Sequence, residues 1–139
     1  MLQSKDTHIV FLALGTNLGD KNINLLIAIA FIAERIGVLS AISSVYESEP
    51  WGFNSENSFL NMVVKVETTL LPEDLLHATQ AIEKTMGRTQ KTETSYQDRV
   101  IDIDIILYDD LVYESEELRI PHPLSRQRPF VWTPLTEIL

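Results

Sequence analysis

Short apolar runs alternate along the chain with longer segments whose polar and apolar positions follow a helical spacing. The clearest run lies at 59–68, where the even positions from Leu60 to Val66 point one way and the odd positions from Phe59 to Glu67 point the other. Apolar runs that end at a turn residue, as 8–14 does at Gly15, are typical of central strands. The pattern predicts four strands, at 8–14, 38–46, 59–68 and 100–107.

Two helices are predicted between these strands. Asp20 can cap a helix over 21–36, and Gly37 stands where a left-handed residue would end it. Pro72 opens a second helix that runs to about Met86 and ends at Gly87.

The remaining segments carry weaker signals. Asp109 and Asp110 predict a turn, after which Leu111–Tyr113 is expected to return as a short edge strand. The tail from Leu118 is rich in proline and arginine, and it is expected to be mostly irregular.

The order strand, helix, strand, strand, helix, strand predicts an α/β (α+β) fold of the ferredoxin-like sandwich type. In that fold two main helices cover one face of an antiparallel sheet, and the other face is available for an active-site cleft. A chain of 139 residues is the size of one domain, so we expect a single domain over 1–139.

Charge and composition exclude several classes of protein. Twenty acidic residues against 11 basic ones give a net charge of −9, which argues against nucleic-acid binding. The absence of cysteine excludes disulfides, thiol nucleophiles and Cys-ligated zinc. The longest apolar run, 25–33, is too short to span a membrane, so we expect a soluble, cytoplasmic protein with no membrane partner.

Asp102 and Asp104 are the strongest chemical signal. Residues two apart in a strand face the same way, so both carboxylates project together while Ile101, Ile103 and Ile105 face the core. Two adjacent carboxylates repel one another unless a cation lies between them, and Mg²⁺ shared with substrate phosphates is the natural candidate. Two acids on a solvent-facing strand are the alternative.

Basic residues gather near this acidic pair. Seven of the 11 lie between 84 and 128, and the segment from Arg88 to Arg99 reads as a loop that carries arginines and Tyr96. Because the planar guanidinium suits phosphate oxygens, a local site for a polyanion is compatible with the overall acidity. Solvated surface charge is the alternative.

Other polar and aromatic residues are candidates for substrate contacts. Phe59 and Asn61 share a strand face and suit a flat heterocycle that forms hydrogen bonds, although packing beneath a loop would also explain them. Gln80 and Glu83 are three apart on the second helix and could meet a ribose or phosphate, or be a surface pair. His122 could bind phosphate or serve a structural role.

The ordered motifs of the chain resemble those of the 6-hydroxymethyl-7,8-dihydropterin pyrophosphokinases of folate biosynthesis. The resemblance runs from about residue 8 to residue 139. It rests on Ala13-Leu-Gly15-Thr-Asn17-Leu, Val45-Tyr46, Pro50-Trp-Gly52, Phe59-Leu-Asn61, Gln80-Ala-Ile-Glu83, Gly87-Arg88, Arg99-Val-Ile-Asp102-Ile-Asp104, Ile120-Pro-His122-Pro and Arg128-Pro-Phe130.

The resemblance implies transfer of pyrophosphate from ATP to the hydroxymethyl group of the dihydropterin, which yields AMP and the pterin diphosphate. Asp102 and Asp104 are then ligands of two Mg²⁺ ions, and Arg88 and Arg99 are catalytic with them. The implied pterin-binding residues are Ser48, Trp51, Phe59, Asn61, Tyr96 and Phe130. The implied ATP-binding residues are Gln80, Glu83, Arg88, Arg99, Ile105, His122 and Arg128.

The chain departs from the family pattern in the catalytic loop, at Gln90, Gln97 and Asp98, and before Trp51, where Glu49 replaces a proline. A nucleotidyltransferase also uses two such acids, but the Gly-Ser pair that those enzymes carry upstream is missing here. A regulatory ligand-binding module is a further alternative, which would leave the acids beside the arginines unexplained. We expect a monomer whose partners are the two small substrates alone.

Overall fold

A single antiparallel sheet is the centre of the computed structural model, which describes residues 6–49, 57–87, 99–123 and 128–139. Its strands follow the order β2-β4-β1-β5, and β3 pairs with β4 beyond the end of β2. The bounds are β1 His8–Thr16, β2 Gly37–Ile42, β3 Tyr46–Ser48, β4 Phe59–Thr68 and β5 Asp102–Tyr108. The four predicted strands therefore lie in the order second, third, first, fourth, and the ferredoxin-like sandwich is confirmed.

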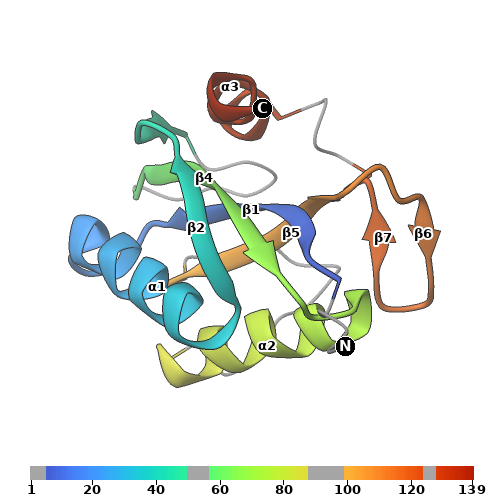
Figure 1. Cartoon of the computed structure of the whole chain (residues 1–139). Helices are drawn as coiled ribbons and strands as arrows, with labels where there is room; N and C mark the ends of the chain where they lie inside the picture. The colour runs from blue at the N-terminus through green and yellow to red at the C-terminus, as the bar shows by residue number, and fades with distance from the viewer. Residues whose placement is uncertain (1–5, 50–56, 88–98, 124–127) are drawn as a thin grey trace.

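Helices cover both faces of this sheet (Figure 1). α1 (Lys21–Arg35) and α2 (Pro72–Thr85) lie on one face, and the predicted core packs between them and the sheet. Ile32 of α1, Ile82 of α2 and Val64 of β4 are fully buried in that core. The main apolar core thus lies between the sheet and two helices. The opposite face of the sheet is available for a functional site.

The ends of the two helices follow their sequence signals, with one exception. The Asp20 carboxylate accepts a hydrogen bond from the Ile23 amide at 3.2 Å, and Gly87 ends α2 with φ at +106°. Gly37, however, is not the left-handed residue that the sequence predicts: it is the first residue of β2. A Cβ atom there would lie 2.0 Å from the Glu67 carbonyl oxygen, so glycine is needed for the close approach of two strands.

The predicted strand 38–46 is interrupted. β2 ends at Ile42 and β3 begins at Tyr46, and the Ser43 hydroxyl bridges the gap by accepting a hydrogen bond from the Val63 amide at 2.9 Å. The interruption lets β3 pair with the end of β4, which carries Phe59 and Asn61.

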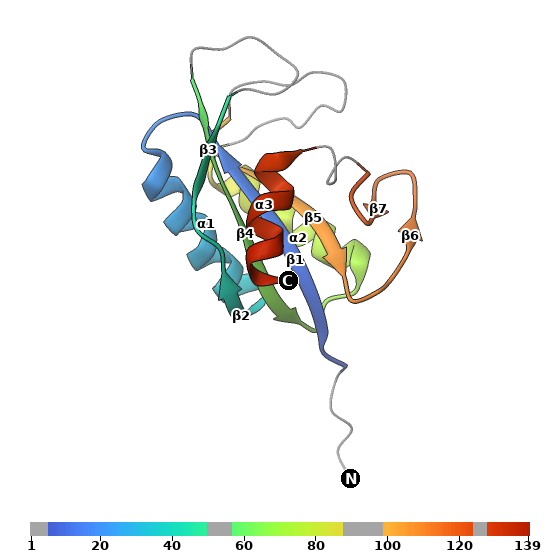
Figure 2. The ribbon, with the colours of Figure 1, turned by 90° about the horizontal axis from the view of Figure 1, so that it is seen from above.

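The tail differs most from the prediction of irregular structure. Pro129–Ile138 form a helix, α3, which packs on the opposite sheet face from α1 and α2 (Figures 1 and 2). Its Val131 and Leu135 bury a second apolar cluster against Phe11 and Val63. Half of the face that the sequence leaves open is therefore covered, and the remainder forms a cavity at the N-terminal end of α3.

A small hairpin precedes that tail. The predicted turn at Asp109 and Asp110 is present, but the edge strand expected at 111–113 lies slightly later, at β6 (Tyr113–Glu114). It pairs with β7 (Arg119–Ile120) in a separate two-stranded sheet rather than with the main one. Among the helices described, none has the length and apolar character needed to cross a membrane.

Candidate active site

An open cavity of about 540 Å³ lies where β1, β3, β4 and β5 meet the start of α3. Eight residues that the sequence singles out line it: Ser48, Phe59, Asn61, Arg99, Asp102, Asp104, Arg128 and Phe130. Five residues that are not predicted to contact substrate or metal line it too: Ala13, Leu14, Gly15, Glu49 and Val131. Residues spread over most of the described chain thus meet at one open cavity.

The two aspartates share one face of β5, as the alternation predicts. Ile103, between them, is 2% exposed and faces the core, whereas both carboxylates are half-buried in the cavity wall. Their partners across the β1–β5 ladder are Gly15 for Asp102 and Ala13 for Asp104. Because these partners have little or no side chain, the carboxylates have open space beside them, and this donor set fits a hard divalent cation.

Arg99 supplies positive charge next to this pair. Its guanidinium lies 3.3 Å from the Asp102 carboxylate, and the two side chains are only 11% and 17% exposed. The same guanidinium is 5.9 Å from the centre of the Phe59 ring, and Arg128 lies at the same distance from the Phe130 ring. The cavity therefore carries an arginine beside an aromatic ring on two sides, a combination suited to phosphate and a flat ring together.

Asn17 fixes Arg99, a role that the sequence analysis misses. The Arg99 amide donates to the Asn17 side-chain oxygen at 2.7 Å, and the Asn17 amide donates to the Arg99 carbonyl at 3.0 Å. The Asn17 side chain is buried, and it also donates to the Asn57 carbonyl at 3.2 Å. The Asn17 side-chain amide thus joins the segments that precede β4 and β5. The Gly-Thr-Asn sequence at the end of β1 is the only local signal for this role.

Asn61 is oriented by its own strand neighbours. Its side-chain nitrogen donates to the Ser48 hydroxyl at 2.8 Å and to the Tyr46 carbonyl at 3.1 Å. Its side-chain oxygen would lie 3.4 Å from a Cβ atom at Gly15, the residue opposite it on β1. Asn61 therefore presents an acceptor toward the cavity, beside the ring of Phe59.

The position of Glu83 differs from the one expected for a residue that contacts ATP. It lies on the core side of α2, is only 3% exposed, and accepts a hydrogen bond from the Ile103 amide at 2.8 Å. Gln80 is exposed on the same helix, so the two do not share a face. Burial gives Glu83 a structural contact instead: it holds β5 between the two aspartates.

The remaining predicted residues lie beside β5 or outside the described chain. The side chain of Ile105 is buried in the core, and the His122 amide donates to the Ile106 carbonyl at 3.1 Å. His122 therefore lies at the edge of β5, beside Ile106, which follows Asp104 by two residues. Trp51, Arg88 and Tyr96 lie outside the described residues.

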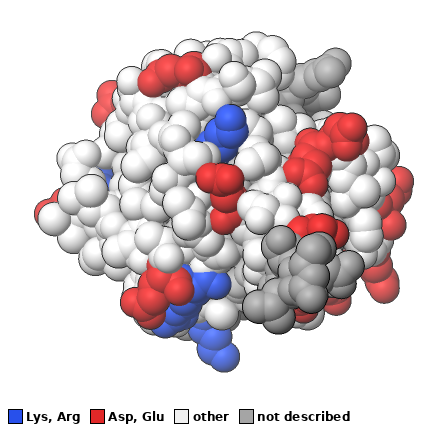
Figure 3. Space-filling view, in the orientation of Figure 1, with Lys and Arg blue, Asp and Glu red and all other residues white. Residues whose placement is uncertain are grey.

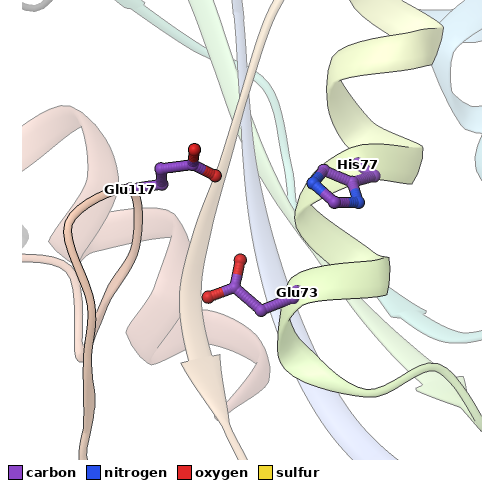
Figure 4. A group of neighbouring side chains, drawn as sticks. All are labelled: Glu73, His77 and Glu117. Atoms are coloured by element: carbon purple, nitrogen blue, oxygen red, sulfur yellow. The ribbon is translucent and has the colours of Figure 1, made fainter.

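A second group of metal-ligand side chains lies away from the cavity (Figure 4). Glu73, His77 and Glu117 place ligand atoms within 4.8 Å of one another, between α2 and the β6–β7 hairpin. Glu73 accepts hydrogen bonds from the Tyr113 hydroxyl at 2.7 Å and the Ser115 hydroxyl at 3.1 Å. The bond to Glu73 raises the pKa of Tyr113, and these hydroxyls explain the gathering without an ion.

Comparisons of the sequence with known proteins show which family the chain belongs to. Residues 11–139 match the family described as 7,8-dihydro-6-hydroxymethylpterin-pyrophosphokinase. A 2-amino-4-hydroxy-6-hydroxymethyldihydropteridine pyrophosphokinase of Porphyromonas gingivalis is 49% identical over 134 residues, which are 94% of this chain and 90% of that protein. The enzyme of the same name from Aquifex aeolicus is 43% identical over 93% of this chain and 79% of its own length.

Solved structures agree in fold. A Plasmodium falciparum HPPK-DHPS chain superposes with a TM-score of 0.70 at 17% identity, over 94% of this chain. A second HPPK-DHPS structure, in complex with substrates, gives a TM-score of 0.71 at 14% identity. This chain spans only 40% of the length of either solved chain. From the family match and the close relatives together, the chain belongs to the 7,8-dihydro-6-hydroxymethylpterin-pyrophosphokinase family.

Proposed function

We propose that this chain transfers pyrophosphate from ATP to the hydroxymethyl group of 6-hydroxymethyl-7,8-dihydropterin, in folate biosynthesis, at the cavity between β5 and α3. One observation carries the proposal: the paired carboxylates of Asp102 and Asp104 share a cavity with Phe59, Asn61 and Phe130. A metal–phosphate site and a site for a flat, hydrogen-bonding ring thus adjoin, as transfer between ATP and a pterin requires.

Asp102 and Asp104 are the residues that would hold two Mg²⁺ ions. Bound Mg²⁺ supplies charge neutralisation on the phosphate chain and orients it for displacement. Arg99, ion-paired to Asp102, holds this end of the site together in the described structure and is available to phosphate oxygens when a cation takes over the carboxylate.

Phe59 and Phe130 are the two faces of the pterin site. Both rings line the cavity from different elements, β4 and α3, so a flat ring fits between them. Asn61 presents its side-chain oxygen to the edge of that ring, and Ser48 supports Asn61. Trp51 and Tyr96 complete the pterin site in this proposal.

ATP binding is assigned to the side of the cavity beyond Arg99 and Arg128. The backbone near Ile105 and the His122 side chain are proposed to receive the nucleoside, with Gln80 beside them. The pterin hydroxyl oxygen attacks the β-phosphorus, and its proton passes to a phosphate oxygen. The bond from that phosphorus to the α-phosphate bridging oxygen breaks, and AMP leaves with that oxygen. Arg88 and Arg99 stabilise the charge that spreads over the phosphoryl oxygens, so positioning and electrostatics supply most of the catalysis.

Replacement of either aspartate tests this assignment. Asp102→Ala and Asp104→Ala are each expected to lower AMP formation by at least about a hundredfold, because a metal ligand is lost. Asp110→Ala, in the exposed turn after the same strand, is the matched control and should keep wild-type turnover. Unchanged circular dichroism would show that the fold survives, and near-wild-type AMP production by either aspartate variant would contradict the proposal.

We also propose that the chain acts as a monomer in the cytoplasm with small-molecule partners alone. A completed cavity within one chain supports this, because its described walls need no second copy. Light scattering during size-exclusion chromatography should give the mass of one chain, 15.8 kDa, and a stable dimer would contradict it.

A further inference from the structure

Three hydrogen bonds converge on Glu137, in the last turn of α3. We propose that Glu137, Ser44 and Tyr46 form a clip, named here the α3–β3 clip, that fixes the two walls of the pterin site relative to each other. Glu137 and Tyr46 are then positioning residues for pterin recognition, and neither lines the cavity itself. This inference rests on the proposed function, because it concerns the pterin site of that proposal.

Both carboxylate oxygens of Glu137 are used. One oxygen accepts from the Ser44 amide at 2.7 Å and from the Ser44 hydroxyl at 2.8 Å. The other accepts a short hydrogen bond from the Tyr46 hydroxyl. The contacts join residues 91 and 93 positions apart in the chain, so they fix α3 against the segment that enters β3.

One wall of the site depends on the β3 end of the clip. Tyr46 pairs with Asn61 across the β3–β4 ladder, and its carbonyl accepts from the Asn61 side chain at 3.1 Å. Ser48, two residues further on, accepts from the same nitrogen at 2.8 Å. A shift of β3 would therefore change the direction in which Asn61 points.

The other wall depends on the α3 end of the clip. Phe130 and Glu137 are seven residues apart, which is close to two full turns, so they lie on the same stripe of α3 about 10 Å apart. Fixing Glu137 thus fixes the rotation of the helix that directs the Phe130 ring into the cavity.

The Glu137 carboxylate lies where a helix does not favour an acidic residue. An acidic residue in the last turn of a helix is disfavoured by the helix dipole, and Glu137 is exposed, so burial of an apolar surface does not explain it. The hydrogen bonds from Tyr46 and then Ser44 lower its pKa and outweigh the opposing effect of desolvation. The carboxylate is therefore held as an anion by its β3 partners.

Two conservative variants test the clip. Tyr46→Phe removes only the hydroxyl donor, and Glu137→Gln keeps the shape of the side chain while removing its charge. Each is expected to raise the KM for the pterin about three- to tenfold, the effect of one hydrogen bond, and to leave the KM for ATP within about twofold. In the double variant the two effects should not add, because both remove the same interaction.

Tyr113→Phe is the matched control. The Tyr113 hydroxyl donates to the Glu73 carboxylate at 2.7 Å, which is the same chemistry between a strand and a helix, but at a place that does not line the cavity. It should leave both KM values unchanged. Pterin binding is measured in addition by fluorescence, with Mg²⁺ and a non-hydrolysable ATP analogue present, so that affinity is known independently of turnover.

The outcomes separate the clip from the proposed function. An unchanged pterin KM and affinity in both variants, or equal rises of the pterin and ATP constants, would overturn the clip. Wild-type chain that binds pterin without forming AMP would overturn the proposed function alone. Wild-type chain that binds no pterin would overturn both.

Discussion

At the scale of single residues, the orientation of the Asn61 side-chain amide decides which hydrogen-bonding groups of a ligand the cavity can bind. The side-chain nitrogen of Asn61 donates to two protein acceptors, the Ser48 hydroxyl and the Tyr46 carbonyl. Its oxygen is left on the cavity side, near Gly15. The site therefore selects a ligand whose edge donates a hydrogen bond at this point, and the amino and ring N–H groups of a pterin meet that requirement.

Replacement of Asn61 tests this orientation. Asn61→Asp keeps the acceptor but loses the two donors, while Asn61→Ala loses both functions. We expect Asn61→Ala to weaken pterin binding by roughly ten- to a hundredfold, because a buried ligand donor is left unsatisfied, and Asn61→Asp to weaken it less. Titration calorimetry measures both; equal affinity of wild type and the alanine variant would contradict the orientation.

Single residues differ in how far the sequence could predict them. Asp102, Asp104, Phe59 and Asn61 are predictable because a two-residue period assigns each to a strand face. Asn17 is not, since its main partner, Arg99, lies 82 positions away and no local pattern encodes the contact. Glu83 fails for a related reason: helical spacing gives the angle between two side chains but not which of them faces the core.

At the scale of elements, the turn after β1 positions the start of β5. Asn17 pairs with Arg99 through both backbone groups of the arginine, and Arg99 in turn contacts Asp102. A change in this turn is therefore transmitted to the charged part of the cavity through one short path.

Asn17→Ala should separate this role from ordinary packing. It removes the side-chain partner of the Arg99 amide and of the Asn57 carbonyl, two part-buried bonds worth about 0.5–1.5 kcal/mol each, and a lower Tm is expected. Because Arg99 is no longer fixed, kcat should also fall by about tenfold.

Asn24→Ala is the control for that variant. Asn24 holds the same turn through the Leu18 carbonyl at 2.7 Å and the Thr16 hydroxyl at 3.2 Å, whereas Asn17 bonds Arg99 directly. It should lower Tm and retain kcat. Equal losses of kcat in the two variants would show that stability alone matters.

Elements were predictable where apolar residues follow a period and caps mark the ends. β4 has the period, α1 and α2 have end signals at Asp20, Pro72 and Gly87, and the structure has all three elements close to the expected bounds. α3 is not predicted, because it carries Pro134 inside and proline normally argues against a helix interior. Its existence depends on burial of Val131 and Leu135 against the sheet, a tertiary effect that local pattern does not contain.

At the scale of the whole molecule, the net charge of −9 does not prevent binding of a polyanion. Acidic side chains are spread over the face in Figure 3, and two unit charges about 10 Å apart in water interact by only about 0.4 kcal/mol. Salt screens such charges over about 8 Å, so under the proposed function ATP binding depends on the arginines beside the cavity and on cations that Asp102 and Asp104 would hold. The acidity continues to argue against nucleic acid as a partner.

Asp109 contributes to the loss of folding stability at acid pH. Its carboxylate joins the end of β5 to the start of β1, by accepting from the Ile9 amide at 2.7 Å and pairing with the His8 ring at 2.7 Å. Desolvation opposes the change, but the bonds to Ile9 and His8 together lower the pKa of Asp109 below 3.8. A lowered folded-state pKa means that this stabilisation is present above pH 3.8 and is lost as the pH falls through the lower value.

Asp109→Asn tests that contribution. Asparagine tolerates the left-handed backbone at this position, where φ is 50°, so only the charge is removed. The variant should melt at a lower temperature than wild type at pH 6, and the difference should vanish as the pH falls below 3.8. A difference that is constant with pH, measured by thermal unfolding, would contradict the assignment.

The central claim is that this cavity moves a pyrophosphoryl group from ATP to a pterin. The most direct measurement incubates the chain with ATP, Mg²⁺ and 6-hydroxymethyl-7,8-dihydropterin and separates the nucleotide products. The account predicts AMP and the pterin diphosphate in equal amounts, with no product when a chelator removes Mg²⁺. Release of ADP, or AMP formation that is unaffected by the chelator, would contradict it.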